Sequence, residues 1–304
     1  MKKILTMVAV LLSGLVSSFG FEPVATNISL GNWDIHPNIY ARALVGTEAV
    51  HDSKNAWVTD VRETVVANQK NGPMFYEAQV NFINIDQKYQ NSLYFLDVGM
   101  KLGEEMNLRL GRIFDAAGYV LPDQPNLNTH DWEREPWGFY SYGLQFELHT
   151  TNVWFLTDVG GASDKSFDEA GNFDRLELSQ FLLWKASDKI SVGYVFQMSD
   201  DLRKEGLLAV LNPIKDLTVS YEAYTVQGDQ KYSGHFILAS YEVCKTIELH
   251  TGVDQQFHNN TADILRAGIM YKMPTDRIRI IVDYDKYVGD EEKSGFYGAF
   301  QLWF

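Results

Sequence analysis

The sequence is poor in cysteine and, after its first twenty residues, has no long apolar run. Its single cysteine, Cys244, excludes an internal disulfide. No stretch of about 18 apolar residues occurs after residue 20, so no transmembrane helix is expected there. Backbone groups in lipid must be paired within the protein, and strands can achieve this in a closed barrel. A membrane-spanning form of this chain would therefore be built from strands.

Motifs of catalysis and metal binding are also missing. The seven histidines are scattered, with no His-Glu-x-x-His or other metal-ligand spacing, and neither Gly-x-Ser-x-Gly nor a phosphate-binding glycine loop is present. His130 and His258 fall near expected loops, but nothing in the sequence pairs them with a serine or an aspartate. We expect no enzyme activity, no cofactor and no metal ion.

The beginning of the chain is typical of a secretory signal peptide. Lys2 and Lys3 precede an apolar run over 4–16, and a small-x-small pattern follows at 18–20. We expect residues 1–20 to be removed and residues 21–304 to form one domain. Two lysines and no acids are lost with the signal, so the formal net charge changes from -14 to -16. This acidic balance disfavours nucleic acid as a partner.

The last eleven residues alternate between two faces, which predicts a strand. Phe296, Gly298, Phe300 and Leu302 share one nearly apolar face. An exposed row of large apolar residues suits a lipid-facing barrel strand of about 10 residues. An aromatic-rich edge strand of a soluble sandwich is the alternative.

Fifteen earlier segments also have strand character, with 204–211 the least regular because Leu207 and Leu208 interrupt the alternation. Residues 21–37 show no such pattern. With the closing segment the total is sixteen, an even number as a closed antiparallel barrel requires, and 14 or 18 strands are also compatible. The segments are 39–50, 56–67, 74–85, 92–102, 106–114, 139–148, 153–160, 176–184, 190–198, 204–211, 217–226, 236–243, 247–257, 265–273 and 278–287.

The connections alternate in length, as they do in outer-membrane barrels. Short turns are expected at 103–105, 149–152 and 187–189, whereas 115–136 is the longest connection after the signal. Together with the terminal Phe304, the stretch Asn107-Leu-Arg-Leu-Gly-Arg-Ile-Phe114 resembles bacterial outer-membrane porins of the sixteen-stranded type, and more weakly phosphate-selective porins. The resemblance implies a Gram-negative outer-membrane location, a homotrimer, and a third outer loop, here 115–136, that folds into the pore.

An inward fold of this loop would oppose its acids to arginines of the first five strands. Opposed charges of this kind would create a transverse field that favours hydrated, polar solutes. Alternatively, the acids are a solvated outer loop and the arginines are ordinary ion pairs. Arg112 is out of register with Arg109 unless the strand bulges. The predicted constriction comprises Arg42, Arg62, Arg109, Arg112, Asp115, Asp123, Asp131, Glu133 and Glu135.

The sequence therefore predicts an all-β transmembrane barrel that acts as a general-diffusion porin for small hydrophilic solutes and ions. The acidic charge favours a weak cation preference. An anion- or phosphate-selective porin is the alternative, and a structural or adhesive barrel is a further one. Expected partners include outer-membrane lipid and lipopolysaccharide, whose phosphates could be bridged through divalent cations. The loop acids available for such bridges are Asp164, Asp168, Asp200, Asp201, Asp290, Glu291 and Glu292.

Overall fold

The computed structural model describes residues 28–46, 57–85, 88–114, 116, 140–162, 176–199, 202–228, 231–257, 263–273, 278–288 and 293–303. Every regular element in these ranges is a β-strand. None of the described residues belongs to a helix of the length and apolarity needed to cross a membrane. The expected signal peptide, 1–20, lies outside these ranges, as does the start of the expected mature domain.

Seventeen strands follow one another along the described chain. They are β1 (Ile28–Leu30), β2 (Trp33–Gly46), β3 (Trp57–Gln69), β4 (Met74–Ile85), β5 (Lys88–Lys101), β6 (Met106–Phe114), β7 (Tyr140–His149), β8 (Val153–Ala162), β9 (Leu176–Ser187), β10 (Ile190–Ser199), β11 (Leu202–Ile214), β12 (Leu217–Gln227), β13 (Tyr232–Cys244), β14 (Ile247–Phe257), β15 (Asp263–Lys272), β16 (Ile278–Val288) and β17 (Lys293–Trp303).

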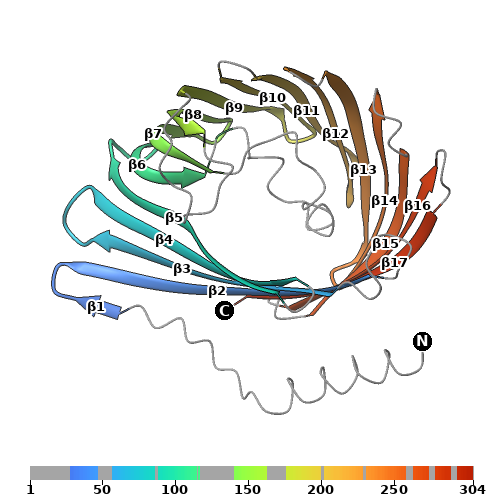
Figure 1. Ribbon diagram of the computed structural model, residues 1–304, viewed down its shortest axis with the longest axis horizontal. Helices are drawn as coiled ribbons and strands as arrows, with labels where there is room; N and C mark the ends of the chain where they lie inside the picture. Colours follow the sequence, from blue (N-terminus) through green and yellow to red (C-terminus); the bar gives the residue numbers. More distant parts are fainter. Residues whose placement is uncertain are drawn as a thin grey trace, which may run out of the picture.

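Strands β2 to β17 form one closed antiparallel barrel. Each strand pairs with its neighbour in the sequence, and β17 returns to pair with β2, for example at Phe300 and Ala43. Figure 1 shows the resulting ring. The three-residue β1 is additional and pairs with the beginning of β2. The predicted all-β barrel with sixteen strands is therefore confirmed.

The strand bounds follow the alternation, although β5 and β13 each begin four residues before the expected strands 92–102 and 236–243. The expected strands 74–85, 106–114 and 247–257 coincide with β4, β6 and β14. The prediction that 21–37 has no regular structure is wrong for 28–30 and 33–37, because β1 and the first part of β2 lie there. Pro37 falls between the stretches of β2 that pair with β1 and with β17, where its missing N–H interrupts neither ladder.

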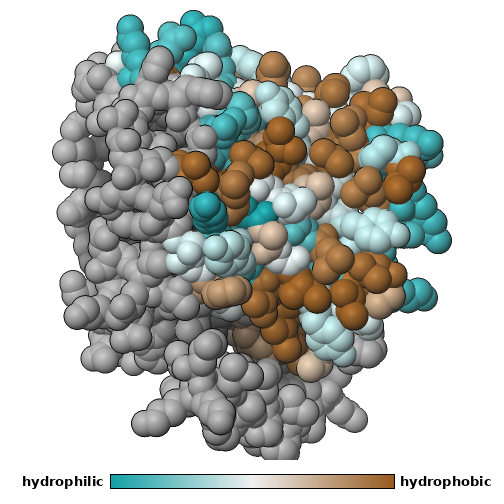
Figure 2. Space-filling model, turned by 90° about the vertical axis from the view of Figure 1, so that its right-hand side faces the viewer, coloured by the Kyte–Doolittle hydropathy of each residue, from teal (hydrophilic) through white to brown (hydrophobic). Residues whose placement is uncertain are grey.

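The two faces of the barrel differ as the alternation predicts. On β9, Leu176, Leu182 and Trp184 are exposed on the outer face, whereas Glu177 and Phe181 are buried on the inner face. Figure 2 shows apolar side chains gathered over the outer face, on the side that β13 to β16 form in Figure 1. Side chains splay apart on a convex wall and crowd together on a concave one, so inward residues lose contact with water even beside a lumen.

Glycines on the inner face give room for this crowding. A side-chain carbon at Gly99 would collide with the ring of Phe75, and one at Gly234 would collide with the hydroxyl end of Tyr224. The large side chains therefore lie along the wall, over a glycine of a neighbouring strand, instead of projecting across the lumen. The short connections gather at one end of the barrel, here called the turn end, which includes the turns at 150–152 and 188–189.

The inner wall of the barrel as a candidate functional site

Arg109 lies on the inner wall, where the sequence places it. Its guanidinium is 2.5 Å from a carboxylate oxygen of Glu77 and 3.6 Å from one of Asp97, and it covers the ring of Phe75 at 5.0 Å. The next residue, Leu110, points outward and is 57% exposed. Arg109 thus belongs to a charged cluster formed by three neighbouring strands, β4, β5 and β6.

Arg112 has the opposite position in the ladder. It pairs with Leu96 and Tyr142. Because residues two apart on a strand share a face, Arg112 is on the face of Leu110 and not on that of Arg109. The side chain is buried, and its guanidinium lies 5.5 Å from the centre of the Tyr142 ring. No shift of register occurs in the described β5–β6 ladder at this point, so the parity weighs against a pore-lining role for Arg112.

Two further arginines of the predicted constriction are placed by the backbone register alone. The backbone register places Arg42 opposite Gln301, which is buried on the inner face, and Arg62 opposite Asn81. The side chains of Arg42 and Arg62 lie outside the described residues. The same holds for all five predicted acids, Asp115, Asp123, Asp131, Glu133 and Glu135. The constriction as a set remains a prediction.

Strands β14 to β16 carry a second charged part of the wall. His250 Nε2 is 2.5 Å from Asp283 Oδ1, and both side chains are fully buried. The two residues stand on β14 and β16 and meet across Gly268 of β15, where any side chain would separate them. Beside them, Arg266 donates two hydrogen bonds to Asp285, from Nε at 3.0 Å and from Nη2 at 3.2 Å. This part of the wall is therefore buried, and its polar side chains are hydrogen-bonded to one another.

Near the turn end of the same strands, the ammonium of Lys272 lies between two carboxylates. Its distance is 2.8 Å to Glu248 and 3.8 Å to Glu242. The alternation predicts that Asp283, Arg266 and Lys272 face inward, but it does not reveal their partners, which stand on adjacent strands. The described residues contain no group of three or more His, Cys, Asp or Glu side chains arranged to hold a metal ion.

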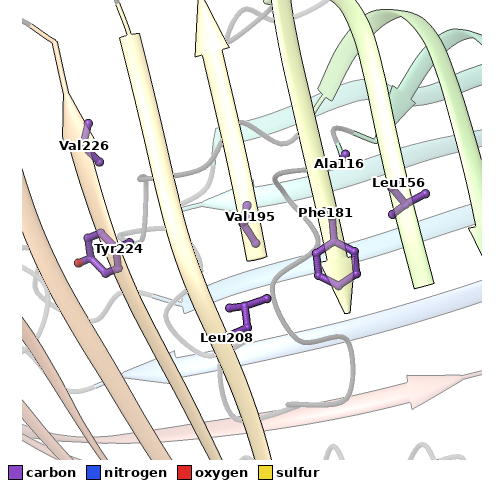
Figure 3. Packing of buried hydrophobic residues seen from close by; sticks show 7 residues of the cluster. All are labelled: Ala116, Leu156, Phe181, Val195, Leu208, Tyr224 and Val226. Atoms are coloured by element: carbon purple, nitrogen blue, oxygen red, sulfur yellow. The ribbon is translucent and has the colours of Figure 1, made fainter. Parts of the chain in front are cut away.

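The inner wall of β8 to β12 also carries a buried apolar cluster. Leu156, Phe181, Val195, Leu208, Tyr224 and Val226 form one buried apolar cluster with Ala116, and Trp154, Leu183 and Val210 pack against it. Figure 3 shows these side chains spread over consecutive strands. The interrupted alternation in the sequence has its cause here, because Leu207 is 60% exposed on the outer face while Leu208 is 2% exposed on the inner face.

Ala116 shows where the chain goes after β6. It is fully buried in the apolar cluster, and its N–H donates to Asp158 Oδ2 at 2.6 Å. Gly111, Gly143 and Gly160 stand opposite one another on β6, β7 and β8, and side chains at these positions would collide with neighbouring backbone. The long connection therefore starts against the inner wall, beside a row of positions that carry no side chains.

Known proteins resemble this chain in structure and not in sequence. No protein-family model matches the sequence, and no curated protein matches it. A solved variant of Rh. blastica porin superposes with a TM-score of 0.70 at 11% identity, covering 89% of this chain and 100% of that one. Salmonella typhi OmpF, solved in complex with daunomycin, superposes with a TM-score of 0.68 at 13% identity, covering 91% and 99%. The chain thus has a bacterial porin-like fold.

Proposed function

We propose that this protein is an outer-membrane porin, a water-filled channel for passive diffusion of small hydrophilic solutes and ions. The observation that carries this proposal is a closed barrel whose outer face exposes apolar side chains while charged clusters stand on the inner wall. An apolar outer face suits hydrocarbon, and a charged inner face suits water. A porin needs no catalytic residues, in keeping with the absence of catalytic motifs.

The proposal includes a constriction by the connection after β6 and a weak preference for cations. Support for the constriction comes from Ala116, which lies against the inner wall, and from the five acids expected farther along the connection. The net charge of -14, or -16 without the signal, would raise the local concentration of cations near the mouth. Over a Debye length of about 8 to 10 Å this focusing acts on ions that approach the pore.

An anion- or phosphate-selective pore is the second candidate. Its support is the arginine set, because arginine forks bind phosphate-like anions well. The geometry of Arg109 weakens it, since two carboxylates already lie within 3.6 Å of that guanidinium. A structural or adhesive barrel would leave the paired charges of the inner wall without a role in transport.

Conductance in planar bilayers tests the proposal. The purified protein should produce stepwise current, and a potassium chloride gradient should give a small reversal potential of cation-selective sign. The triple variant Asp131→Asn, Glu133→Gln, Glu135→Gln should reduce that potential, and Arg109→Ala should increase it. An anion-selective sign that Arg109→Ala abolishes would replace the first candidate by the second. Strand-rich protein without conductance would favour the structural barrel.

The assembly and its lipid partners form a separate part of the proposal. The porin-like fold supports a homotrimer in the bacterial outer membrane, with lipopolysaccharide around it. Native mass spectrometry in mild detergent measures the number of subunits. A stable monomer would contradict the trimer and leave the channel proposal in place.

A further inference from the structure

The carboxylates of the inner wall differ in whether their partners are cations or neutral hydrogen-bond donors. Most of those described above have a cationic partner, such as Arg109, Arg266 or Lys272. Glu147 on β7 is different. It accepts one hydrogen bond from Asn107 Nδ2 at 3.0 Å and one from Trp154 Nε1 at 3.2 Å, and within the described part of the chain it has no ion pair. Its charge is therefore positioned by neutral donors and is not neutralised locally.

Two aromatic rings stand beside this carboxylate. The rings of His149 and Trp154 stack with centroids 5.4 Å apart and planes inclined by 27°. Phe181 supports the indole from the apolar cluster, at 5.2 Å and nearly perpendicular. His149 is exposed, and Glu147 and Trp154 are half-buried, so the group is held firmly on one side and is open on the other.

Exposed acids lie beside this group. The backbone N–H of His149 donates to the carbonyl of Glu105 at 2.8 Å, which joins the turn after β5 to the end of β7, and Glu104 and Glu105 are exposed in that turn. The nearby described cations are Lys101, Arg109, which is held by Glu77 and Asp97, and Lys185, which is paired with Asp188. An anionic solute would be repelled here, whereas a cation would be attracted.

We propose that Glu147, Trp154 and His149 form a binding site for organic cations that carry both an ammonium group and a flat ring. The ammonium would lie against the Glu147 carboxylate, and the ring would extend the stack that His149 and Trp154 begin. Ammonium groups are attracted both to carboxylates and to aromatic faces, and flat rings pack well on aromatic pairs. This inference rests on the proposed channel function and specifies a solute class for it.

Current block in planar bilayers provides the test. Phenyltrimethylammonium is added on the turn-end side of the wild-type channel, and its half-blocking concentration is compared with that of tetramethylammonium and of benzenesulfonate. The ring-bearing cation should block at a concentration at least tenfold lower than tetramethylammonium, and benzenesulfonate should not block.

Variants assign the block to these residues. Glu147→Gln keeps one of the two acceptor oxygens and removes the charge, so it should weaken block by phenyltrimethylammonium about tenfold, which corresponds to about 1.4 kcal/mol. Trp154→Leu should abolish the advantage of the ring and leave tetramethylammonium unaffected. Glu177→Gln is the matched control, because Glu177 is also held by neutral donors, Gln197 and Ser179, but is buried. Phenyltrimethylammonium should block the Glu177→Gln channel at the same concentration as the wild-type channel.

The outcomes separate the inference from the channel proposal. A protein that folds and carries no potassium current contradicts the channel itself. A protein that conducts but is blocked equally by both cations, or whose block is the same in wild type and in Trp154→Leu, contradicts the organic-cation site. Heat-modifiable mobility on gels verifies folding of each variant, and the comparison among wild-type blockers stands without any variant.

Discussion

The apolar cluster on the inner wall of β8 to β12 and the polar groups on the inner wall of β14 to β16 are both buried, but their side chains interact by different chemistry. The first is a cluster of apolar side chains around Phe181 and Leu208, and the second contains polar pairs, the hydrogen-bonded His250 with Asp283 and the ion pair of Arg266 with Asp285. The concave wall thus removes water from both kinds of side chain. In the first region a lost side chain leaves a void, whereas in the second it leaves a charge without its partner.

The largest effect is expected where one partner of a buried charge pair is removed. Asp285→Ala takes both hydrogen bonds of that carboxylate from Arg266, which is 7% exposed. Loss of one partner from such a pair costs about 4 kcal/mol of unfolding free energy. Urea unfolding of the lipid-embedded barrel, followed by tryptophan fluorescence, measures it.

The matched control replaces both partners. Arg266→Met with Asp285→Leu should restore most of the lost stability, because an apolar pair of similar volume can substitute for a buried ion pair. A double variant as unstable as Asp285→Ala would show that the wall at β15 and β16 requires the charges themselves.

In the apolar region the corresponding change is Phe181→Ala. Phe181 is fully buried and packs on Trp154, so its truncation should leave a cavity and cost about 3 kcal/mol. Phe181→Leu should cost about 1 kcal/mol because it keeps most of the volume. The same urea titration compares the two. Equal stability of both variants would mean that the cluster contributes little, contrary to its burial.

Two inner glycines, Gly268 on β15 and Gly252 on β14, compare packing against a polar pair with packing against an apolar side chain of β13. Gly268→Ala would place a methyl group between His250 and Asp283 and should cost about 2 kcal/mol, since the pair cannot move apart without losing its contact. At Gly252 the same methyl group would lie 3.2 Å from Leu238 Cδ1, and that flexible side chain can turn aside, although the carbonyl of Ile237 is at 2.9 Å. Gly252→Ala should therefore cost less. The reverse order would contradict the distinction between rigid and adaptable packing.

The smallest effect on the free energy of unfolding is expected at an exposed ion pair, which is a reference for the buried pairs. In the turn after β9, the Lys185 ammonium lies 2.7 Å from Asp188 Oδ1, and its hydrogen bond and charge lower the pKa of Asp188. A lowered pKa means that this contribution is present above the unfolded-state pKa and is lost as the pH falls through the folded-state pKa.

Lys185→Met should return the pKa of Asp188 toward its usual value, and about 1 M salt should move it in the same direction. A carboxyl NMR titration measures both shifts. An unchanged pKa in Lys185→Met would assign the shift to another group. Overall stability should change little, because the pair is exposed.

Most of the fold could be predicted because alternation is a local property of the chain. The expected strand 106–114 needed no knowledge of its neighbours, and the inward position of Arg109 followed from it. Its partners could not be read in the same way, since Glu77 and Asp97 meet Arg109 only through the register of three strands, which depends on turn geometry. The alternation does not predict the apolar inner wall, because two adjacent leucines, Leu207 and Leu208, interrupt it although they belong to opposite faces of the strand.

The short strand β1 bears on the order in which the barrel can close. Among the described residues, β2 pairs with β17 over seven residue pairs, Tyr40 to Gly46, compared with twelve for the hairpin β4–β5 and six for β5–β6. β1 adds three pairs at the other end of β2 and lies only two residues away from it in sequence. A contact so local costs little loop entropy and can form early, whereas joining β17 to β2 spans almost the whole chain. The last step of closure therefore joins β17 to an edge of β2 whose other end β1 already covers.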